Sequence, residues 1–121
     1  MYQAEVDKGR NLLKVSYAQQ VTVEEAKRWA EELGLMLREL RPGFRVLADL
    51  SGLESMDLGC VPHIKTMMKL CDKKGVAMVA RVIPDPRKDI GLNILSLFHY
   101  DRRVQIVTCE TMDEALSALA A

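Results

Sequence analysis

Apolar and polar residues alternate with the period of a β-strand near the start of the chain. Residues 12–17 (LLKVSY) show this alternation and are rich in β-branched and aromatic side chains. Residues 7–10 (DKGR) in front of them have the composition of a turn. We therefore predict an opening β-hairpin, with residues 2–6 as its first strand and residues 12–17 as its second.

The pattern changes to helical spacing after residue 21. Thr22 and Glu25 form a capping-box sequence, in which the threonine hydroxyl and the glutamate carboxylate satisfy free amides at a helix start. Pro42 and Gly43 then end the pattern. The apolar positions in between recur at steps of three and four: Val23, Ala26, Ala30, Leu33, Leu37 and Leu40. The sequence thus predicts a helix over residues 22–40 with one face on a sheet.

The middle of the chain alternates between short apolar runs and one amphipathic stretch. Residues 44–50 are short, apolar and followed by Ser51 and Gly52, which predicts a buried strand that ends there. Residues 62–74 place Ile64, Met67, Met68 and Cys71 at helical spacing, and Gly75 closes this second helix. Residues 76–83 form the most apolar run and predict a central strand.

The last part of the chain continues the alternation. We predict a third helix from Asp89, a strand over residues 104–107, and a closing helix after the capping-box residues Thr111 and Glu114. Ile90, Ile94, Leu95 and Phe98 would line one side of the third helix; Ala115, Leu116 and Leu119 would line the closing one. Strict alternation predicts an α/β fold: a mixed, mainly parallel β-sheet with crossover helices, as a single domain over residues 1–121.

Charge and cysteine content narrow the classes of partner and compartment. Seventeen Lys and Arg balance seventeen Asp and Glu, so the chain lacks the positive excess that favours nucleic acid. Its apolar runs are too short to insert into a membrane. Three widely spaced cysteines fit reduced thiols better than a disulfide framework, which favours the cytoplasm. The sequence is compatible with a homodimer.

One stretch resembles a known family. Residues 46–50 (VLADL) are followed by Ser55-Met56-Asp57, a glycine, a helix, and residues 73–76 (KKGV) at the next strand. This order resembles the STAS domain of the SpoIIAA-like superfamily, shared by sulfate transporters and bacterial anti-sigma factor antagonists, and the likeness covers nearly the whole chain. The resemblance implies that fold, and a protein partner such as an anti-sigma-factor-like kinase or a related regulator.

The family's phosphorylated serine has no counterpart at its usual place. In antagonists of this family a serine directly follows the loop aspartate, whereas Leu58 follows Asp57 here, with Gly59 and Cys60 after it. Leucine carries no hydroxyl to accept a phosphoryl group. We therefore expect no phosphorylation at this position, and only Ser51 and Ser55 offer weak substitutes.

Cys60 and His63 lie three residues apart near a helix start. This spacing suggests an alternative function as an enzyme, with Cys60 as the nucleophile and His63 as its base. No orienting acid or oxyanion site accompanies them, and two ligands do not make a zinc site. We therefore favour a buried structural cysteine and expect no enzyme activity, no metal and no cofactor. For Asp57 we favour a simple helix cap over a partner contact. For Trp29 we favour the flank of the core over an interface anchor.

Two functions follow from these observations. The first is a non-catalytic regulatory or scaffolding module that binds a protein partner through the strand-end loop and second helix. Because Met67 and Met68 are adjacent, we expect at least one to be exposed beside this loop. The candidate contacts are Ser55, Asp57, Leu58, Gly59, Cys60, His63 and Met68. The alternative is a small-ligand or lipid-binding domain with an apolar pocket between the sheet and helix three, near Leu97 and Phe98.

Overall fold

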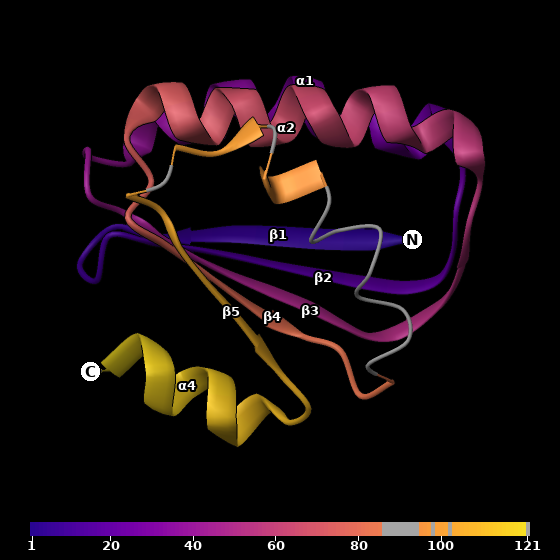
Figure 1. Ribbon diagram of the computed structural model, residues 1–121. Helices are drawn as coiled ribbons and strands as arrows, with labels where there is room; N and C mark the ends of the chain where they lie inside the picture. The colour runs from indigo at the N-terminus through magenta and orange to yellow at the C-terminus, as the bar shows by residue number, and fades with distance from the viewer. Residues whose placement is uncertain (86–94, 98, 102, 121) are drawn as a thin grey trace.

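A mixed β-sheet forms the centre of the protein (Figure 1). The computed structural model describes residues 1–85, 95–97, 99–101 and 103–120. Within them the strands are β1 (Tyr2–Asp7), β2 (Leu12–Val21), β3 (Arg45–Met56), β4 (Met78–Val82) and β5 (Gln105–Cys109), and they lie in that order across the sheet. The β1 and β2 strands are antiparallel and all other neighbours are parallel, which confirms the predicted opening hairpin and mainly parallel sheet.

Helices cover both faces of this sheet. Figure 1 shows α1 (Val23–Met36) and α2 (Val61–Lys74) on one face and α4 (Met112–Ala120) on the other. A short 3-10 turn, η1 (Leu37–Glu39), extends α1. The predicted third helix lies largely outside the described residues, including Asp89, Ile90, Ile94 and Phe98; residues 95–97 and 99 are helical.

Local signals set the ends of these helices. The Glu25 amide donates to Thr22 Oγ1 over 3.2 Å and the Glu25 carboxylate accepts from the Thr22 amide, so the predicted capping box forms. The Thr111 hydroxyl accepts from the Glu114 amide at the start of α4. Gly75 ends α2 with φ of 97°, a left-handed conformation that costs glycine little because it lacks a Cβ.

The apolar core is divided between the two faces of the sheet. Leu13 and Val15 of β2 point to the α1 and α2 side, whereas Leu12 packs toward α4. This follows from the two-residue period of a strand. Trp29 is buried on the first side, donates from Nε1 to Tyr17 Oη over 2.9 Å and packs on the Tyr2 ring, which confirms the core interpretation of Trp29.

The predicted end of β3 is wrong. Ser51 and Gly52 do not stop the strand, which continues to Met56 because β2 remains paired with it up to Val21. The register shifts between Ser16 and Ala18 and again between Gln19 and Gln20. These irregularities let both strands continue past residues that favour a turn, so pairing between strands outweighs local composition.

The expectation that Met67 or Met68 is exposed is also wrong. Both side chains are buried, and Met68 has only 7% of its surface exposed. Consecutive helical residues are about 100° apart. Because α2 packs against the sheet below it and against α1 beside it, its buried arc is wide enough to cover both positions.

Candidate functional site

The segment between β3 and α2 displays one large apolar side chain to solvent. It contains the 3-10 turn η2 (Leu58–Cys60). The side chain of Leu58 is 88% exposed, and Ser55, Asp57 and Gly59 around it are exposed too. Leu58 is the most exposed of the large apolar side chains in the described part of the chain, ahead of Leu97 at 81% and Leu35 at 60%. The exposed Leu58 therefore identifies this segment as a candidate contact surface.

Hydrogen bonds and packing hold the segment in place. Cys60 is completely buried beside Val21 and Ala26, and its thiol donates to the Val21 carbonyl over 3.6 Å. The Cys60 amide also donates to the Asp57 carbonyl over 2.9 Å. A Cβ at Gly59 would lie 2.8 Å from Val23 Cγ2, so glycine lets the turn approach the start of α1 closely. Leu58 is thus presented on a fixed support.

Asp57 does not cap a helix through its side chain. It occupies the position before η2, but its carboxylate makes no capping hydrogen bond. The helix-cap interpretation of Asp57 is therefore wrong. Its backbone accepts from Cys60 instead, and its carboxylate is exposed beside Leu58.

The surroundings of Cys60 disfavour a nucleophile. Burial raises the pKa of the Cys60 thiol, and the nearby Asp57 carboxylate raises it further. The thiol is therefore protonated at neutral pH, whereas a nucleophile must be a thiolate. The complete burial of Cys60 and the burial of Met68 also remove both residues from the candidate contact surface. His63 is half-buried and remains at its margin.

The two hydroxyls considered for phosphorylation have different settings. Ser51 is exposed, but its hydroxyl is already hydrogen-bonded. Its Oγ donates to Asp49 Oδ1 over 2.6 Å, and its amide donates to the same oxygen over 2.9 Å. Ser55 is exposed near the end of β3, where it is paired with Gln20.

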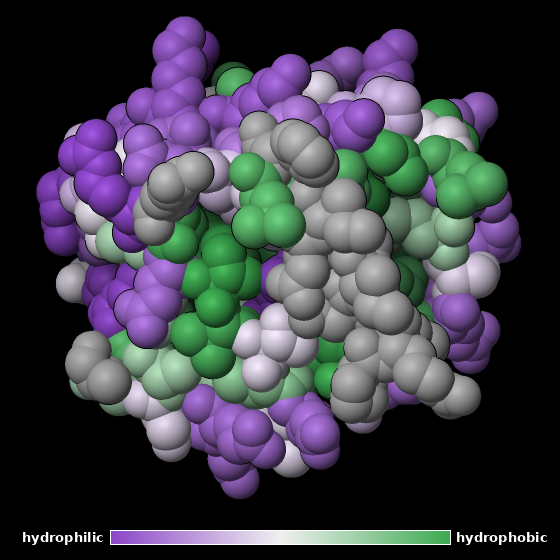
Figure 2. Space-filling view, in the orientation of Figure 1, coloured by the Kyte–Doolittle hydropathy of each residue, from purple (hydrophilic) through white to green (hydrophobic). Residues whose placement is uncertain are grey.

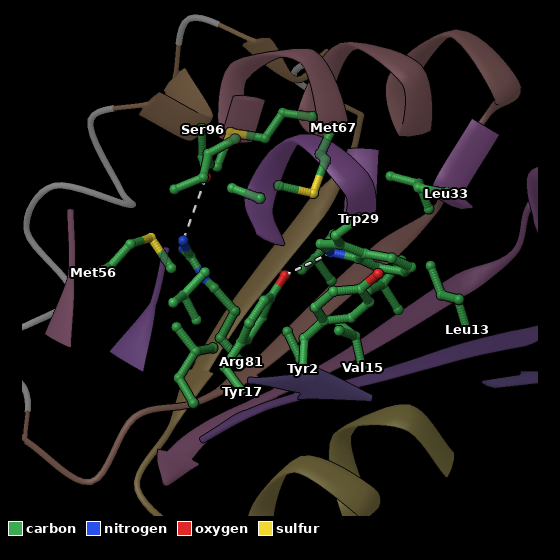
Figure 3. Close-up of a pocket in the computed structure, with 18 of the residues that line it drawn as sticks. Tyr2, Leu13, Val15, Tyr17, Trp29, Leu33, Met56, Met67, Arg81 and Ser96 are labelled. Carbon is green, nitrogen blue, oxygen red and sulfur yellow. Dashed lines mark hydrogen bonds between the residues drawn. The ribbon is translucent and has the colours of Figure 1, made fainter. Parts of the chain in front are cut away.

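A second feature is an apolar cavity of about 110 Å³ under α1 and α2 (Figure 3). Its lining includes Tyr17 of β2, Trp29 of α1, Met67 of α2 and Arg81 of β4. The alternative function placed a pocket next to Leu97 and Phe98. The cavity does lie between the sheet and this segment, because Ser96 and Tyr100 line it. The placement is wrong for Leu97, which is 81% exposed and does not line the cavity, and Phe98 lies outside the described residues.

The sequence interpretation overlooked Arg81. A signal was present, since Arg81 is the charged residue inside the otherwise apolar run over residues 76–83. A charge in a buried strand needs polar or charged contacts, so such a residue marks a candidate site.

Figure 2 shows apolar surface in the middle of the face that carries the helical residues 95–97, with hydrophilic residues above and below it.

Neither a metal centre nor a membrane span is found in the described part of the chain. No group of three or more His, Cys, Asp or Glu side chains there is placed to hold a metal ion. No helix within those residues combines the length and the apolar character needed to cross a membrane.

Comparisons with known proteins give a fold and no family. No protein-family model and no curated protein matches the sequence. An uncharacterized DUF3478-family protein with a SpoIIAA-like fold from Shewanella loihica superimposes with a TM-score of 0.76, over 98% of this chain and 93% of that one, at 15% identity. The chain has the SpoIIAA-like fold. That result confirms the fold that the sequence resemblance implied.

Two anti-sigma factor antagonists share this SpoIIAA-like fold. Unphosphorylated SpoIIAA matches over 100% of this chain and 99% of its own, with a TM-score of 0.68 and 12% identity. An antagonist from Mycobacterium paratuberculosis matches over 100% and 96%, with a TM-score of 0.61 and 20% identity. SpoIIAA from Bacillus is also known in a phosphorylated form.

Proposed function

We propose that this chain is a non-catalytic regulatory or scaffolding module that binds a protein partner in the cytoplasm. The contact surface consists of Ser55, Asp57, Leu58 and Gly59, with His63 at its margin. The observation that carries the proposal is the exposure of Leu58 on a segment held by buried Cys60. Burying a leucine side chain stabilises a complex by about 1.5–3 kcal/mol, and a fixed support avoids an ordering cost on binding.

Other observations support a protein as the partner. Loops at strand ends commonly carry binding residues on a rigid scaffold. The balance of seventeen basic and seventeen acidic residues disfavours nucleic acid. Similarity in fold to anti-sigma factor antagonists favours an anti-sigma-factor-like kinase or a related regulator as the partner class.

A photo-crosslinking amino acid placed at position 58 in cells of the protein's own host tests this function, because it captures a protein that contacts this position. Leu35 on α1 is the matched control, because it is also a leucine and is 60% exposed. We expect one discrete protein adduct from position 58 and none from position 35. Equal adducts from both positions, or none from position 58, would contradict a contact surface at Leu58.

We further propose that this binding does not depend on phosphorylation of residues 51–60. Leu58 has no hydroxyl, and a phosphate near Asp57 would add nearly two negative charges beside an exposed carboxylate. Peptide mass spectrometry on protein from its own host should find no phosphate in this segment. Substantial phosphoserine at Ser51 or Ser55 would show instead that a phosphorylation switch exists at a displaced residue.

A further inference from the structure

The sheet ends in a strand that has one open side. β1 is the first strand in the order of the sheet, and β2 is its one neighbour in the described part of the chain. Sheet edges in natural proteins are usually protected from pairing with other molecules by lysine, proline or a β-bulge. β1 has none of these, since its sequence is YQAEVD and it pairs with β2 over all six residues without a register shift.

The pairing of β1 with β2 identifies the backbone groups on the open side. The Ala18 amide donates to the Met1 carbonyl over 2.8 Å, and the Met1 ammonium donates to the Ala18 carbonyl over 3.0 Å. Hydrogen-bonded and non-hydrogen-bonded pairs alternate along an antiparallel ladder. Counted from Met1, the residues whose N–H and C=O groups point away from β2 are therefore Tyr2, Ala4 and Val6.

The sequence of β1 suits antiparallel pairing with a second copy of itself. In a register centred on Ala4, that residue faces its own counterpart, and Tyr2 faces Val6 of the second copy. Each of these outward-facing residues then exchanges two hydrogen bonds with the residue that it faces. On the other face of the sheet, the exposed Gln3 lies across from Glu5 of the second copy, so its amide can donate to that carboxylate.

Other registers of the same pairing are less favourable. A centre on Glu5 would place the Glu5 carboxylates of the two copies opposite each other, and like charges in that position are destabilising. A centre on Gln3 would leave Val6 beyond the end of the other strand. The register centred on Ala4 uses every outward-facing residue of β1 and opposes no like charges.

Three carboxylates of α1 that lie near β1 already have partners within each copy. The Glu25 carboxylate lies 3.1 Å from the N-terminal ammonium, and the Glu39 carboxylate lies 3.3 Å from the Lys8 ammonium. The third carboxylate, of Glu32, accepts a hydrogen bond from the Tyr2 hydroxyl. These partners reduce the repulsion between the α1 helices of two copies joined at this edge.

We propose that two copies of this chain form a homodimer through their β1 edges, in the antiparallel register centred on Ala4. The dimer joins the two five-stranded sheets into one continuous sheet, with α1 and α2 of both copies on the same face. One short pair of strands is a small interface, so monomer and dimer exchange. The β1 edge does not include Leu58, so the dimer stands or falls independently of partner binding.

Sedimentation velocity of the full chain, from about 10 μM to about 1 mM, should show a dimer with a Kd on the order of 100 μM or tighter. Gln3→Lys should tighten it by about threefold or more, because the new ammonium faces Glu5 of the second copy and the two-fold axis repeats the pair. Gln3→Glu should weaken it by a similar factor. Gln105 is the matched control, because it is an exposed glutamine on β5, the strand at the other end of the sheet. Gln105→Lys and Gln105→Glu should leave the Kd unchanged.

Ala4→Pro tests the backbone contacts. Proline removes the N–H that donates across the two-fold axis, and that N–H does not point at β2, so the hairpin can be retained. We expect a folded variant that stays monomeric at every concentration. The Gln3 variants change only an exposed side chain, so they test the register whether or not Ala4→Pro folds.

Three outcomes would overturn the proposal. The first is an unmodified chain that is monomeric at about 1 mM. The second is a weaker dimer in Gln3→Lys, which would show that like positions, and not Gln3 and Glu5, face each other. The third is an equal change in Kd from the Gln3 and Gln105 variants, which would place the contact away from β1.

Discussion

Phe44→Ala is expected to lower the free energy of unfolding by about 3–5 kcal/mol. Phe44 has no exposed surface and is among the largest fully buried side chains. It packs in the cluster that contains Leu33, Leu40 and Val46, between the sheet and the α1 and α2 layer. Truncation removes apolar contacts and leaves a cavity that close-packed neighbours fill only in part. Urea or guanidinium melts measure this loss directly.

Leu35→Ala provides the control for that measurement. Leu35 is 60% exposed, so its truncation should change the free energy of unfolding by no more than about 0.5 kcal/mol. Met68→Ala belongs to the same series and should cost about 2–5 kcal/mol because Met68 is buried. A loss at Met68 as small as that at Leu35 would show that the second helix does not pack as described.

Periodic signals in the sequence predicted most of the fold. Thr22 and Glu25 located the start of α1, and Gly75 located the end of α2, because caps satisfy backbone groups that no other residues reach. The alternation of strands and helices predicted parallel pairing, since a crossover helix returns the chain to the end of the sheet where the previous strand began. These features depend on neighbours in the sequence, which is why they can be predicted from it.

Features set by distant residues were predicted less well. The extension of β3 to Met56 depends on its pairing with β2, and the burial of Met68 depends on α1 lying beside α2. Neither neighbour can be inferred from the segment itself. The Thr22 cap depends only on residues next to it in the sequence. The conformation of Asp57 also depends on a distant residue, because the Cys60 thiol of its turn donates to the Val21 carbonyl.

The candidate sites show the same division. The sequence singled out Leu58 by its place after Asp57, but only the structure shows how far its side chain extends into solvent. The sequence predicted an apolar pocket between the sheet and the third helix, and Ser96 of that segment does line the cavity. The walls from α1 and α2 could not be predicted, because these helices and the strands that face them are far apart along the chain. Arg81, a charged residue inside an apolar run, was a further signal that the sequence interpretation overlooked.

Leu58→Asp is expected to weaken partner binding by about 30-fold or more, the change that corresponds to about 2 kcal/mol at an interface hot spot. The substitution removes an apolar anchor and would bury a carboxylate in the apolar site that receives it. Because Leu58 contributes little to the core, the free energy of unfolding should be nearly unchanged.

The most direct test of the partner-binding surface is a calorimetric titration with the partner protein that the crosslink at position 58 identifies. The unmodified chain, Leu58→Asp and Leu35→Asp are each titrated with that purified partner, after melts show that all three are folded. We predict that Leu58→Asp loses affinity by about 30-fold or more, while Leu35→Asp retains the affinity of the unmodified chain. Equal affinity for all three proteins, or a loss confined to Leu35→Asp, would contradict a binding surface centred on Leu58.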